Sequence, residues 1–362
     1  MKKRILCLID GFSLGGAERQ LIGLAYLLKC KGYDVELCSY LRRNFYDELI
    51  ESYNLYSVCL DVKGGKISKF MAVRKHIKER NYGCVIAFKD GATIGTCVLK
   101  LLGMDFRLIV SERNTTQILT RHEKIKYWLY RYANYIIPNS YSQETFIKKN
   151  FHNLAKKVFL ITNFTDTDFF NPAERDYNEE KGIIVVARIA RQKNIIRFLR
   201  VVKRLKDLHL KFHVTWYGDV SANEENYLVE CMSLYNELEI ADIMDFCHAT
   251  TKIREVYQNS DIFCLPSIYE GYPNAICEAM SCGKPILCSK VCDNPYIVQE
   301  GINGLLFDPF DENDMFQVIR RMLTYDRKML YKMGNKSREM GLASFSSEKF
   351  IKKYISLIEN AN

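Results

Sequence analysis

The sequence has 362 residues, of which 48% are hydrophobic and 26% are charged. This length and apolar content exclude a disordered chain and predict two domains, each with its own core. The net charge of +9 lies in one half: Lys and Arg outnumber Asp and Glu by 28 to 17 in residues 1–175, but number 24 against 26 in residues 176–362. Such asymmetry fits nucleic acid, anionic lipid, a phosphorylated acceptor or a merely solubilising surface, and composition does not choose among them.

The start of the chain and its cysteines point to the cytoplasm. Residues 5–9 form an apolar run too short for a signal peptide, and Asp10 interrupts it. No apolar run approaches the roughly 18 residues of a membrane-spanning helix. The 13 cysteines include no C-x-x-C pair. We therefore expect reduced, mostly buried cysteines, and neither disulfides nor a zinc site.

Strands alternate with helices along the first half. A buried strand at residues 4–9 precedes a helix at residues 17–29, whose leucines recur at helical spacing. Further strand signals follow at residues 34–40, 85–88, 107–110 and 135–138. This alternation predicts a mostly parallel, doubly wound sheet with ligand positions at the carboxyl ends of its strands.

The loop between the first strand and the first helix is rich in glycine. It contains Gly11, Gly15 and Gly16. We expect these residues to adopt positive φ and to let the backbone approach a ligand at the helix N-terminus, as in a phosphate cradle. A tight structural turn is the alternative, and the spacing is not the G-x-G-x-x-G of dinucleotide-binding folds.

Two segments of the first half are strongly basic. Residues 63–80 contain seven basic residues, and residues 121–132 interleave four Lys and Arg with four aromatic residues. This mixture suits the surface of an anionic membrane, stacking on single-stranded nucleic acid, or ordinary amphipathic helices with aromatic residues in the core. All three interpretations stay open.

The second half begins after an acidic, polar segment, residues 163–181, which we expect to be the interdomain linker. It contains Asp166 and Asp168, spaced as in metal-binding D-x-D pairs, but a linker position argues against a metal site. Strand signals continue at residues 183–187, 212–217, 243–246, 262–265 and 285–289, and a helix closes the chain at residues 347–357.

The most informative stretch is residues 263–283, FCLPSIYEGYPNAICEAMSCG. After a buried strand and a turn, Pro273 begins a helix that Gly283 closes. The apolar residues of this helix share one side, so we expect Glu278 to face away from the core. Glu270 lies eight residues earlier in the loop that feeds the helix.

This arrangement suits a ligand with two kinds of group. Free N–H groups at a helix start attract a phosphate, whereas carboxylates accept hydrogen bonds from sugar hydroxyls. A nucleotide sugar carries both. Two ordinary solvated carboxylates are the alternative for Glu270 and Glu278 taken alone.

The pattern PS…EG…EAM…G-x-P resembles that of the retaining glycosyltransferases of family 4, which have the GT-B fold. The matching residues are Pro266, Ser267, Glu270, Gly271, Glu278, Ala279, Met280, Gly283 and Pro285. The resemblance extends over nearly the whole chain. Elsewhere it rests on Gly15, Gly16, Ala17 and Glu18 (G-G-x-E), on Ser111, Glu112 and Arg113, on Asn139 and Ser140, and on Arg188 and Lys193 (R-x4-K).

The resemblance implies an α/β protein of GT-B architecture, with two Rossmann-like, doubly wound domains facing an interdomain cleft. An acceptor-binding domain would comprise residues 1–168, with a C-terminal helix in residues 346–362 packing back on it. A nucleotide-sugar-binding domain would comprise residues 169–345.

The resemblance also assigns roles to residues. Arg188 and Lys193 would grip the donor diphosphate, Glu270 the donor sugar and Glu278 the ribose, which makes Glu270, Arg188 and Lys193 the catalytic candidates. The donor-binding candidates are Gly15, Gly16, Arg188, Lys193, Glu270, Gly271, Tyr272, Asn274, Ala275 and Glu278. Arg113 stands where many members have a sugar-contacting histidine, so Arg113 and Asn139 are candidate contacts to the acceptor or sugar.

The implied activity is transfer of a sugar, with retention and without a metal, from a nucleotide-diphosphate sugar to a hydroxyl of a lipid-linked or growing glycan in surface polysaccharide biosynthesis. No cofactor is expected beyond the donor substrate. The expected partners are the nucleotide sugar, the acceptor and the anionic inner face of the cell membrane, but no nucleic acid. Alternatives are a nucleotide-sugar 2-epimerase or phosphorylase of the same fold, a non-catalytic sugar-binding subunit, and a nucleic-acid-binding protein.

Overall fold

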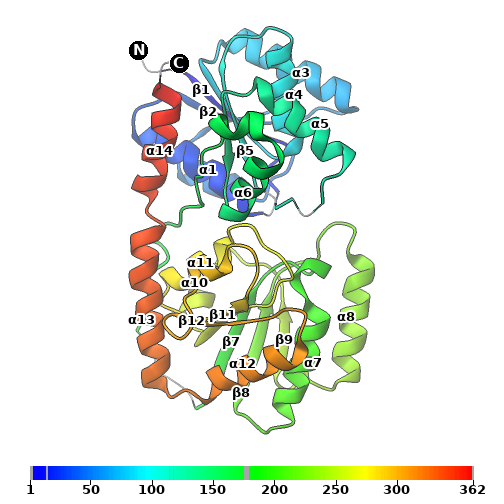
Figure 1. The fold of residues 1–362 in the computed structure, drawn as a ribbon, viewed down its shortest axis with the longest axis vertical. Coiled ribbons are helices and arrows are strands. Elements are labelled where there is room, and N and C mark those ends of the chain that lie inside the picture. The colour runs from blue at the N-terminus through cyan, green and yellow to red at the C-terminus, as the bar shows by residue number, and fades with distance from the viewer. Residues whose placement is uncertain (1–2, 14, 114, 117, 175–178, 361–362) are drawn as a thin grey trace. The chain divides into compact units, whose positions relative to one another are not determined.

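The computed structural model describes residues 3–13, 15–113, 115–116, 118–174 and 179–360 (Figure 1). The chain divides into two compact units. Unit 1 comprises residues 1–164 and 347–362, and unit 2 comprises residues 165–346. Each unit contains a six-stranded parallel sheet, which agrees with the predicted α/β class.

Unit 1 is built from alternating strands and helices, and α14 joins them from the far end of the chain. Its elements are β1 (Ile5–Ile9), α1 (Gly16–Cys30), β2 (Val35–Ser39), α2 (Asp47–Ser52), β3 (Tyr56–Cys59), α3 (Lys66–Arg80), β4 (Cys84–Phe88), α4 (Asp90–Leu101), β5 (Arg107–Glu112), α5 (Arg121–Leu129), the 3-10 helix η1 (Tyr130–Tyr132), β6 (Tyr135–Pro138), α6 (Tyr141–Asn150), the 3-10 helix η2 (His152–Lys157) and α14 (Ser347–Glu359). The sheet order is β3-β2-β1-β4-β5-β6, so the winding reverses between β1 and β4.

The sequence of β1 explains why this sheet is covered on both faces. Ile5, Cys7 and Ile9 lie in one core with residues of α1 and α14. Leu6 and Leu8, which alternate with them, lie in a second core with residues of α3, α4 and α5. A strand buried on both faces is apolar at every position, which is why β1 reads as a continuous apolar run.

Helix α14 belongs to unit 1 although residues 165–346 precede it. Phe350, Tyr354 and Ile358 lie in the same core as α1. Arg107, at the start of β5, donates from Nη1 to the carbonyl oxygens of Leu357 (2.9 Å) and Ile358 (2.8 Å). These bonds satisfy carbonyl groups that a helix C-terminus otherwise leaves unpaired.

Unit 2 repeats this topology. Its elements are β7 (Lys181–Val186), the 3-10 helix η3 (Arg191–Lys193), α7 (Ile195–Lys206), β8 (Phe212–Tyr217), α8 (Glu225–Glu237), β9 (Met244–Cys247), α9 (Ile253–Gln258), β10 (Ile262–Leu265), α10 (Asn274–Ser281), β11 (Ile286–Ser289), α11 (Asn294–Ile297), β12 (Gly304–Phe307), α12 (Glu312–Thr324) and α13 (Arg327–Ser344). The sheet order is β12-β11-β10-β7-β8-β9, with the reversal between β7 and β10.

The first boundary between the units lies after residue 164 rather than after residue 168, and unit 2 ends at residue 346 rather than 345. Thr165 N–H donates to the carbonyl oxygen of Phe345 (3.1 Å). Arg338 Nη1 donates to those of Thr167 (2.9 Å) and Phe170 (2.8 Å). These bonds hold the first part of the expected linker on unit 2, where Phe170 is in the core. Residues 175–178 of that linker lie outside the described residues.

The cysteines are free thiols, and nine of the 13 are buried. Burial raises the pKa of Cys84 and Cys282 to about 12, so these thiols stay protonated and pack as small apolar side chains. Among the described residues, no helix combines the length and the apolar character needed to cross a membrane.

Candidate functional site

The carboxyl ends of β7 and β10 meet where the strand order of unit 2 reverses, which is the usual ligand position in an open α/β sheet. Arg188 and Lys193 follow β7, and Glu270 follows β10. Lys193 Nζ forms an ion pair with Glu270, and the two side chains are 13% and 9% exposed. The structure thus brings two of the three predicted catalytic residues into contact.

Two hydrogen bonds hold the loops that carry this pair. Ile268 N–H donates to the carbonyl oxygen of Gln192 (2.8 Å). Gln192 Nε2 donates to that of Tyr269 (2.7 Å). Because the loop after β7 is fixed to the loop after β10, Lys193 and Glu270 are positioned before any ligand binds.

Arg188 differs from Lys193 in its exposure and in its partners. Its side chain is exposed, and within the part of the chain that the structure describes it forms no side-chain hydrogen bond or ion pair. Arg188 therefore adds a second cation beside the Lys193–Glu270 pair, next to the reversal point. A guanidinium group in this position binds phosphate oxygens well, because its donors form a planar fork.

Helix α10 carries the other predicted donor contacts. Asn274 and Ala275 occupy its first turn, Pro273 is its N-cap, and Gly271 and Tyr272 lie in the loop before it. Tyr272 is 8% exposed, and its ring lies 6.3 Å from that of Phe345 in an edge contact. This contact packs the loop before α10 against the end of α13.

The expectation that Glu278 turns away from the core is wrong. Glu278 is 3% exposed, and Tyr257 OH donates to its Oε2 at 3.0 Å. The reason is that Tyr257 belongs to α9, which packs against this side of α10. A buried carboxylate held by a phenol has a fixed orientation, which suits the recognition of hydroxyl groups better than a solvated side chain does.

The glycine loop of unit 1 also differs from its predicted role. Gly15 has φ 177°, which is extended backbone and not the positive φ that we expected. A Cβ at this position would lie 2.4 Å from Glu18 Oε2, so a larger residue would require the Glu18 side chain to shift. The loop before α1 therefore receives a carboxylate of its own helix, which makes it a poor phosphate cradle.

Glu18 is 1% exposed and forms an ion pair with Lys89. Ser13 Oγ donates to Glu18 Oε1 at 2.9 Å. Lys89 follows β4, has φ 68°, and was not among the predicted site residues. Its position directly after a strand next to the reversal point is the signal that could have identified it.

Arg113 and Asn139 follow two neighbouring strands of unit 1. Residues Glu112 of β5 and Pro138 of β6 are paired in the sheet, so the next residues, Arg113 and Asn139, lie side by side. Arg113 Nη1 donates to Asn163 Oδ1 (2.7 Å), and Nη2 donates to Tyr354 OH (3.1 Å). Asn139 is 4% exposed, and its Oδ1 has no hydrogen-bond partner among the residues that the structure describes.

Residues 121–132 are only partly the basic, aromatic surface that the sequence suggested. Lys126 is 2% exposed and forms ion pairs with Glu112 (3.0 Å) and Glu123 (2.8 Å). Tyr127 and Tyr130 are 1% and 0% exposed, and both hydroxyl groups donate to Glu112. These residues form the core because α5 packs over the sheet. The outer face keeps exposed residues, namely Arg121, Lys124, Ile125, Trp128 and Arg131.

Two groups of side chains among the described residues have the spacing of metal ligands. They are Glu36, Cys38 and His76, and Asp90, His122 and Glu123. Protein cations already lie at both groups: Arg80 is 3.6 Å from Glu36, and Lys126 is 2.8 Å from Glu123. Asp166, part of the D-x-D pair, instead accepts the backbone N–H groups of Asp168 (3.2 Å) and Phe169 (2.9 Å). Its carboxylate therefore stabilises a turn.

Comparison with known proteins places this site in a family. Residues 166–340, which form nearly all of unit 2, match the model described as "Glycosyl transferases group 1". This part of the chain is similar to glycosyl transferases group 1. This agrees with the family suggested by the motifs around Glu270 and Glu278 and makes the protein a glycosyltransferase.

Relatives of this chain include bacterial glycosyltransferases. The chain is 26% identical over 291 residues, 76% of each chain, to a Campylobacter jejuni α-1,4-N-acetyl-D-galactosaminyltransferase named for a diphospho-undecaprenol-linked GalNAc acceptor. It is 23% identical over 384 residues to an Escherichia coli α-1,3-galactosyltransferase named for UDP-Gal and a GlcNAc-diphosphoundecaprenol, covering 96% of this chain and 95% of that one.

Solved structures support the GT-B fold. A structure of Anabaena Alr3699/HepE, in complex with UDP and glucose, has a TM-score of 0.87 at 17% identity and covers 99% of this chain and 100% of that one. WaaG, a glycosyltransferase involved in lipopolysaccharide biosynthesis, has a TM-score of 0.77 at 13% identity over 99% and 100% of the two chains.

Proposed function

We propose that this glycosyltransferase moves a sugar, with retention and without a metal ion, from a nucleotide-diphosphate sugar to a hydroxyl of a lipid-linked or growing glycan. The observation that carries the proposal is the cluster of Lys193, Glu270 and Arg188 at the strand reversal of unit 2, beside the α10 helix with its buried Glu278. The names of the relatives, several of them enzymes for diphospho-undecaprenol-linked acceptors, support the acceptor class.

In the proposed reaction the acceptor oxygen attacks the anomeric carbon on the face from which the diphosphate leaves. The new C–O bond forms as the bond between carbon and phosphate oxygen breaks, and the acceptor proton passes to the departing diphosphate. Arg188, Lys193 and the N–H groups at the start of α10 stabilise the charge that grows on this diphosphate. Glu270 orients the donor sugar, and Glu278 the ribose.

No cofactor takes part in this proposal, since the nucleotide sugar is a substrate and two cations with a helix N-terminus suffice to hold a diphosphate. The test is incubation of the protein with a panel of nucleotide sugars and diphospho-undecaprenol-linked acceptors, followed by NMR of the product. We expect the product to keep the anomeric configuration of the donor, both in the presence and in the absence of EDTA. An inverted linkage, loss of activity in EDTA with recovery in Mn²⁺, or a 2-epimer formed without acceptor would contradict the proposal.

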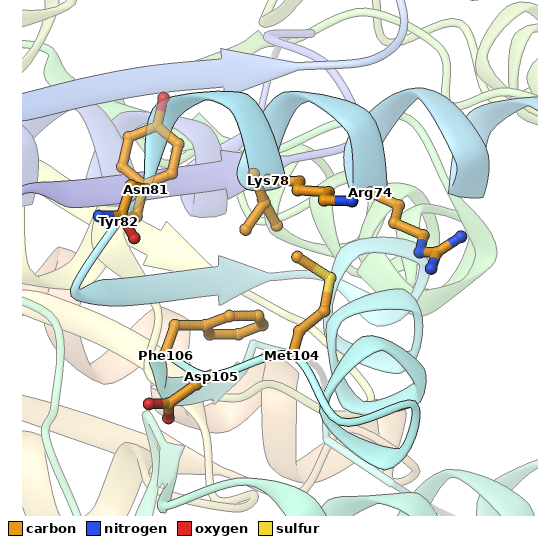
Figure 2. A pocket seen from close by; sticks show the side chains of 8 residues that line it. Arg74, Lys78, Asn81, Tyr82, Met104, Asp105 and Phe106 are labelled. Carbon is orange, nitrogen blue, oxygen red and sulfur yellow. The ribbon is translucent and has the colours of Figure 1, made fainter.

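We also propose that unit 1 contacts the anionic cytoplasmic face of the membrane. Helices α3 and α5 cover the same face of its sheet. On α3, Ile67 is 80% exposed and Met71 is 49% exposed. Figure 2 shows the adjoining pocket, which has a volume of about 270 Å³. Arg74 and Lys78 line it together with apolar side chains, and Asn81 and Asp105 also line it. The two cations and the apolar side chains suit a lipid headgroup and its first methylenes.

Vesicle co-sedimentation tests this contact. Replacing Arg74, Lys75 and Lys78 by Gln is expected to weaken binding to anionic vesicles by about 3 kcal/mol, since each basic residue near such a surface contributes roughly 1 kcal/mol. The matched control replaces three lysines of unit 2, namely Lys203, Lys211 and Lys336, and should bind as the wild type does. Equal binding by both variants, or none by the wild type, would contradict the membrane contact.

A further inference from the structure

The pocket beside α3 lies at the amino edge of the sheet of unit 1. Residues 81–82, which line it, lead from α3 into β4, and residues 104–106, which also line it, lead from α4 into β5. These two strands are neighbours in the sheet. Ligands of open α/β sheets bind at the opposite, carboxyl edge. The pocket is therefore separate from the ligand position at the strand reversal of unit 1.

Apolar side chains form the inner walls of this pocket, and hydrogen bonds fix both walls. Ile77, Tyr82 and Phe106 are buried and line it. Tyr82 OH and His76 Nε2 form a hydrogen bond of 3.1 Å. On the facing wall, Lys100 Nζ donates to the carbonyl oxygen of Phe106 at 2.8 Å. The walls are therefore formed before a ligand binds, so a ligand does not need to order them.

Two cations and a carboxylate line the pocket without pairing with one another. Arg74 and Lys78 extend from α3, and Asp105 lies on the segment that faces this helix (Figure 2). Across the described ranges of the chain, none of these three side chains forms an ion pair or a hydrogen bond. Asn81, the left-handed residue that ends α3, adds an amide group. The pocket thus offers positive and negative charge in separate places.

Size and charge together indicate the ligand. The volume of about 270 Å³ is slightly below the roughly 300–1,000 Å³ of pockets that enclose drug-sized ligands, so the pocket suits a smaller group. A purely anionic group would leave Asp105 unpaired. A phosphate next to a primary ammonium group matches both charges, because Arg74 and Lys78 donate to phosphate oxygens while the ammonium group donates to Asp105 and to the amide oxygen of Asn81.

We propose that this pocket binds the headgroup of a membrane phospholipid with a primary ammonium group beside its phosphate, a phosphoethanolamine lipid. The proposal deepens the proposed contact of unit 1 with the membrane and rests on it. Ile67 and Met71 of α3 are exposed, and burial of such side chains in a bilayer is favourable, which argues for a lipid rather than a soluble phosphoethanolamine. A lipid bound here holds unit 1 by the amino edge of its sheet.

The first experiment compares two sets of vesicles with the same surface charge. Both contain the same fraction of phosphatidylglycerol, and the remaining lipid is phosphatidylcholine in one set and phosphatidylethanolamine in the other. Both of these headgroups are zwitterionic, but the trimethylated ammonium group of choline has no N–H to donate. We expect the wild type to co-sediment at least about tenfold more tightly with the ethanolamine set, because hydrogen bonds between charged groups are gained.

Asp105→Ala should abolish this preference and bind the choline set at least as tightly as the wild type does, because it removes the ammonium partner alone. The matched control is Glu79→Ala, which removes an exposed carboxylate of α3 that does not line the pocket and should keep the preference. Looser packing of ethanolamine bilayers would favour both variants equally. A preference that survives Asp105→Ala would therefore overturn the proposal.

The second experiment tests the source of the headgroup. Soluble glycerophosphoethanolamine, followed by ligand-observed NMR, should bind more weakly than the ethanolamine vesicles, and binding as tight as that of the vesicles would overturn the choice of a lipid. Equal binding of the wild type to both vesicle sets would reject the headgroup pocket and leave the membrane contact standing, whereas binding to neither would reject both. If the preference depends on Asp105 but no nucleotide sugar supports transfer, the pocket stands and the proposed transfer fails.

Discussion

The two units share one topology and differ in the charges at their strand ends. Each sheet reverses its strand order beside the first strand of the unit. In unit 2 the cation near this point, Lys193, pairs with Glu270, and Arg188 forms no ion pair with any residue that the structure describes. In unit 1, Lys89 pairs with Glu18, and the cation with neutral partners is Arg113, at the end of β5. The topology thus determines where a ligand lies, and the side chains at the strand ends determine its chemistry.

The match to the family model also separates the two units. It covers residues 166–340, nearly the whole of unit 2, and stops short of unit 1. This is what we expect if the members of the group share a donor site and differ in their acceptors. The predictions that follow test whether the buried cation Lys126 of unit 1 serves stability and whether Lys193 and Arg188 of unit 2 bind phosphate.

The largest effect is expected from Lys126→Ala. This change leaves Glu112 buried among tyrosines without its cation, and breaking a buried ion pair from one side costs roughly 3–5 kcal/mol. Urea unfolding followed by circular dichroism measures the loss. The control is Lys124→Ala, an exposed neighbour, which should change the free energy of unfolding by no more than about 0.5 kcal/mol. Similar values for both variants would show that the cluster is not structural.

In unit 2 the corresponding changes should affect catalysis more than folding. Lys193→Ala and Arg188→Ala are each expected to lower kcat by roughly 10²–10³, because each removes a preorganised charge from the leaving diphosphate. Affinity for the free nucleoside should not change. The control is Lys203→Ala, whose side chain pairs with Asp207 on the surface of α7. If kcat is retained in both site variants, the diphosphate binds elsewhere.

Glu278→Gln tests the nucleotide side of the same site. Loss of a hydrogen bond to a charged group should weaken nucleotide binding by about 1.5–3 kcal/mol. Tyr257→Phe, which removes the phenol that orients Glu278, should have a smaller effect in the same direction. Calorimetric titration with nucleoside diphosphate measures both, and an unchanged affinity for Glu278→Gln would reject the ribose role.

The smallest effect is expected for the pH dependence of the stability of unit 1, through Glu36. Burial by itself raises the pKa of Glu36, but hydrogen bonds from His76 and Tyr82 and the charges of His76 and Arg80 outweigh burial and lower it. A carboxyl whose folded pKa is lowered adds stability above its unfolded pKa of about 4.3, and this stability is lost as the pH falls through the folded pKa. We expect the urea concentration at the unfolding midpoint of the wild type to decrease once the pH is lowered below about 4. The decline should be shallower in Glu36→Gln, and identical pH profiles would contradict the assignment.

Much of the fold could be predicted because both sheets are parallel and buried. Apolar runs such as residues 262–265 coincide with the strands of the structure. The edge strands β3 and β12 were not predicted. In β3 three of the four residues are exposed, so the segment has no apolar run, and only its pairing with β2 identifies it as a strand.

The candidate site was predictable in position but not in environment. Motif spacing located Glu270, Lys193 and Arg188, because these residues follow strands that the sequence already indicated. The burial of Glu278 was not predictable, since it depends on Tyr257 from another helix. The same holds for Lys126 and the tyrosines beside it, whose burial comes from packing over the sheet rather than from the local pattern of residues 121–132.

The position of α14 at the end of the chain affects when unit 1 can fold during synthesis. Domains usually fold as they emerge during synthesis, the N-terminal one first. Unit 1 departs from this order, because Phe350, Tyr354 and Ile358 of α14 belong to the core that also contains β1. The ribosome must release the whole of unit 2 before that core is complete. Until then, apolar residues of α1 remain uncovered, so nascent unit 1 is the part of the protein that we expect chaperones to bind.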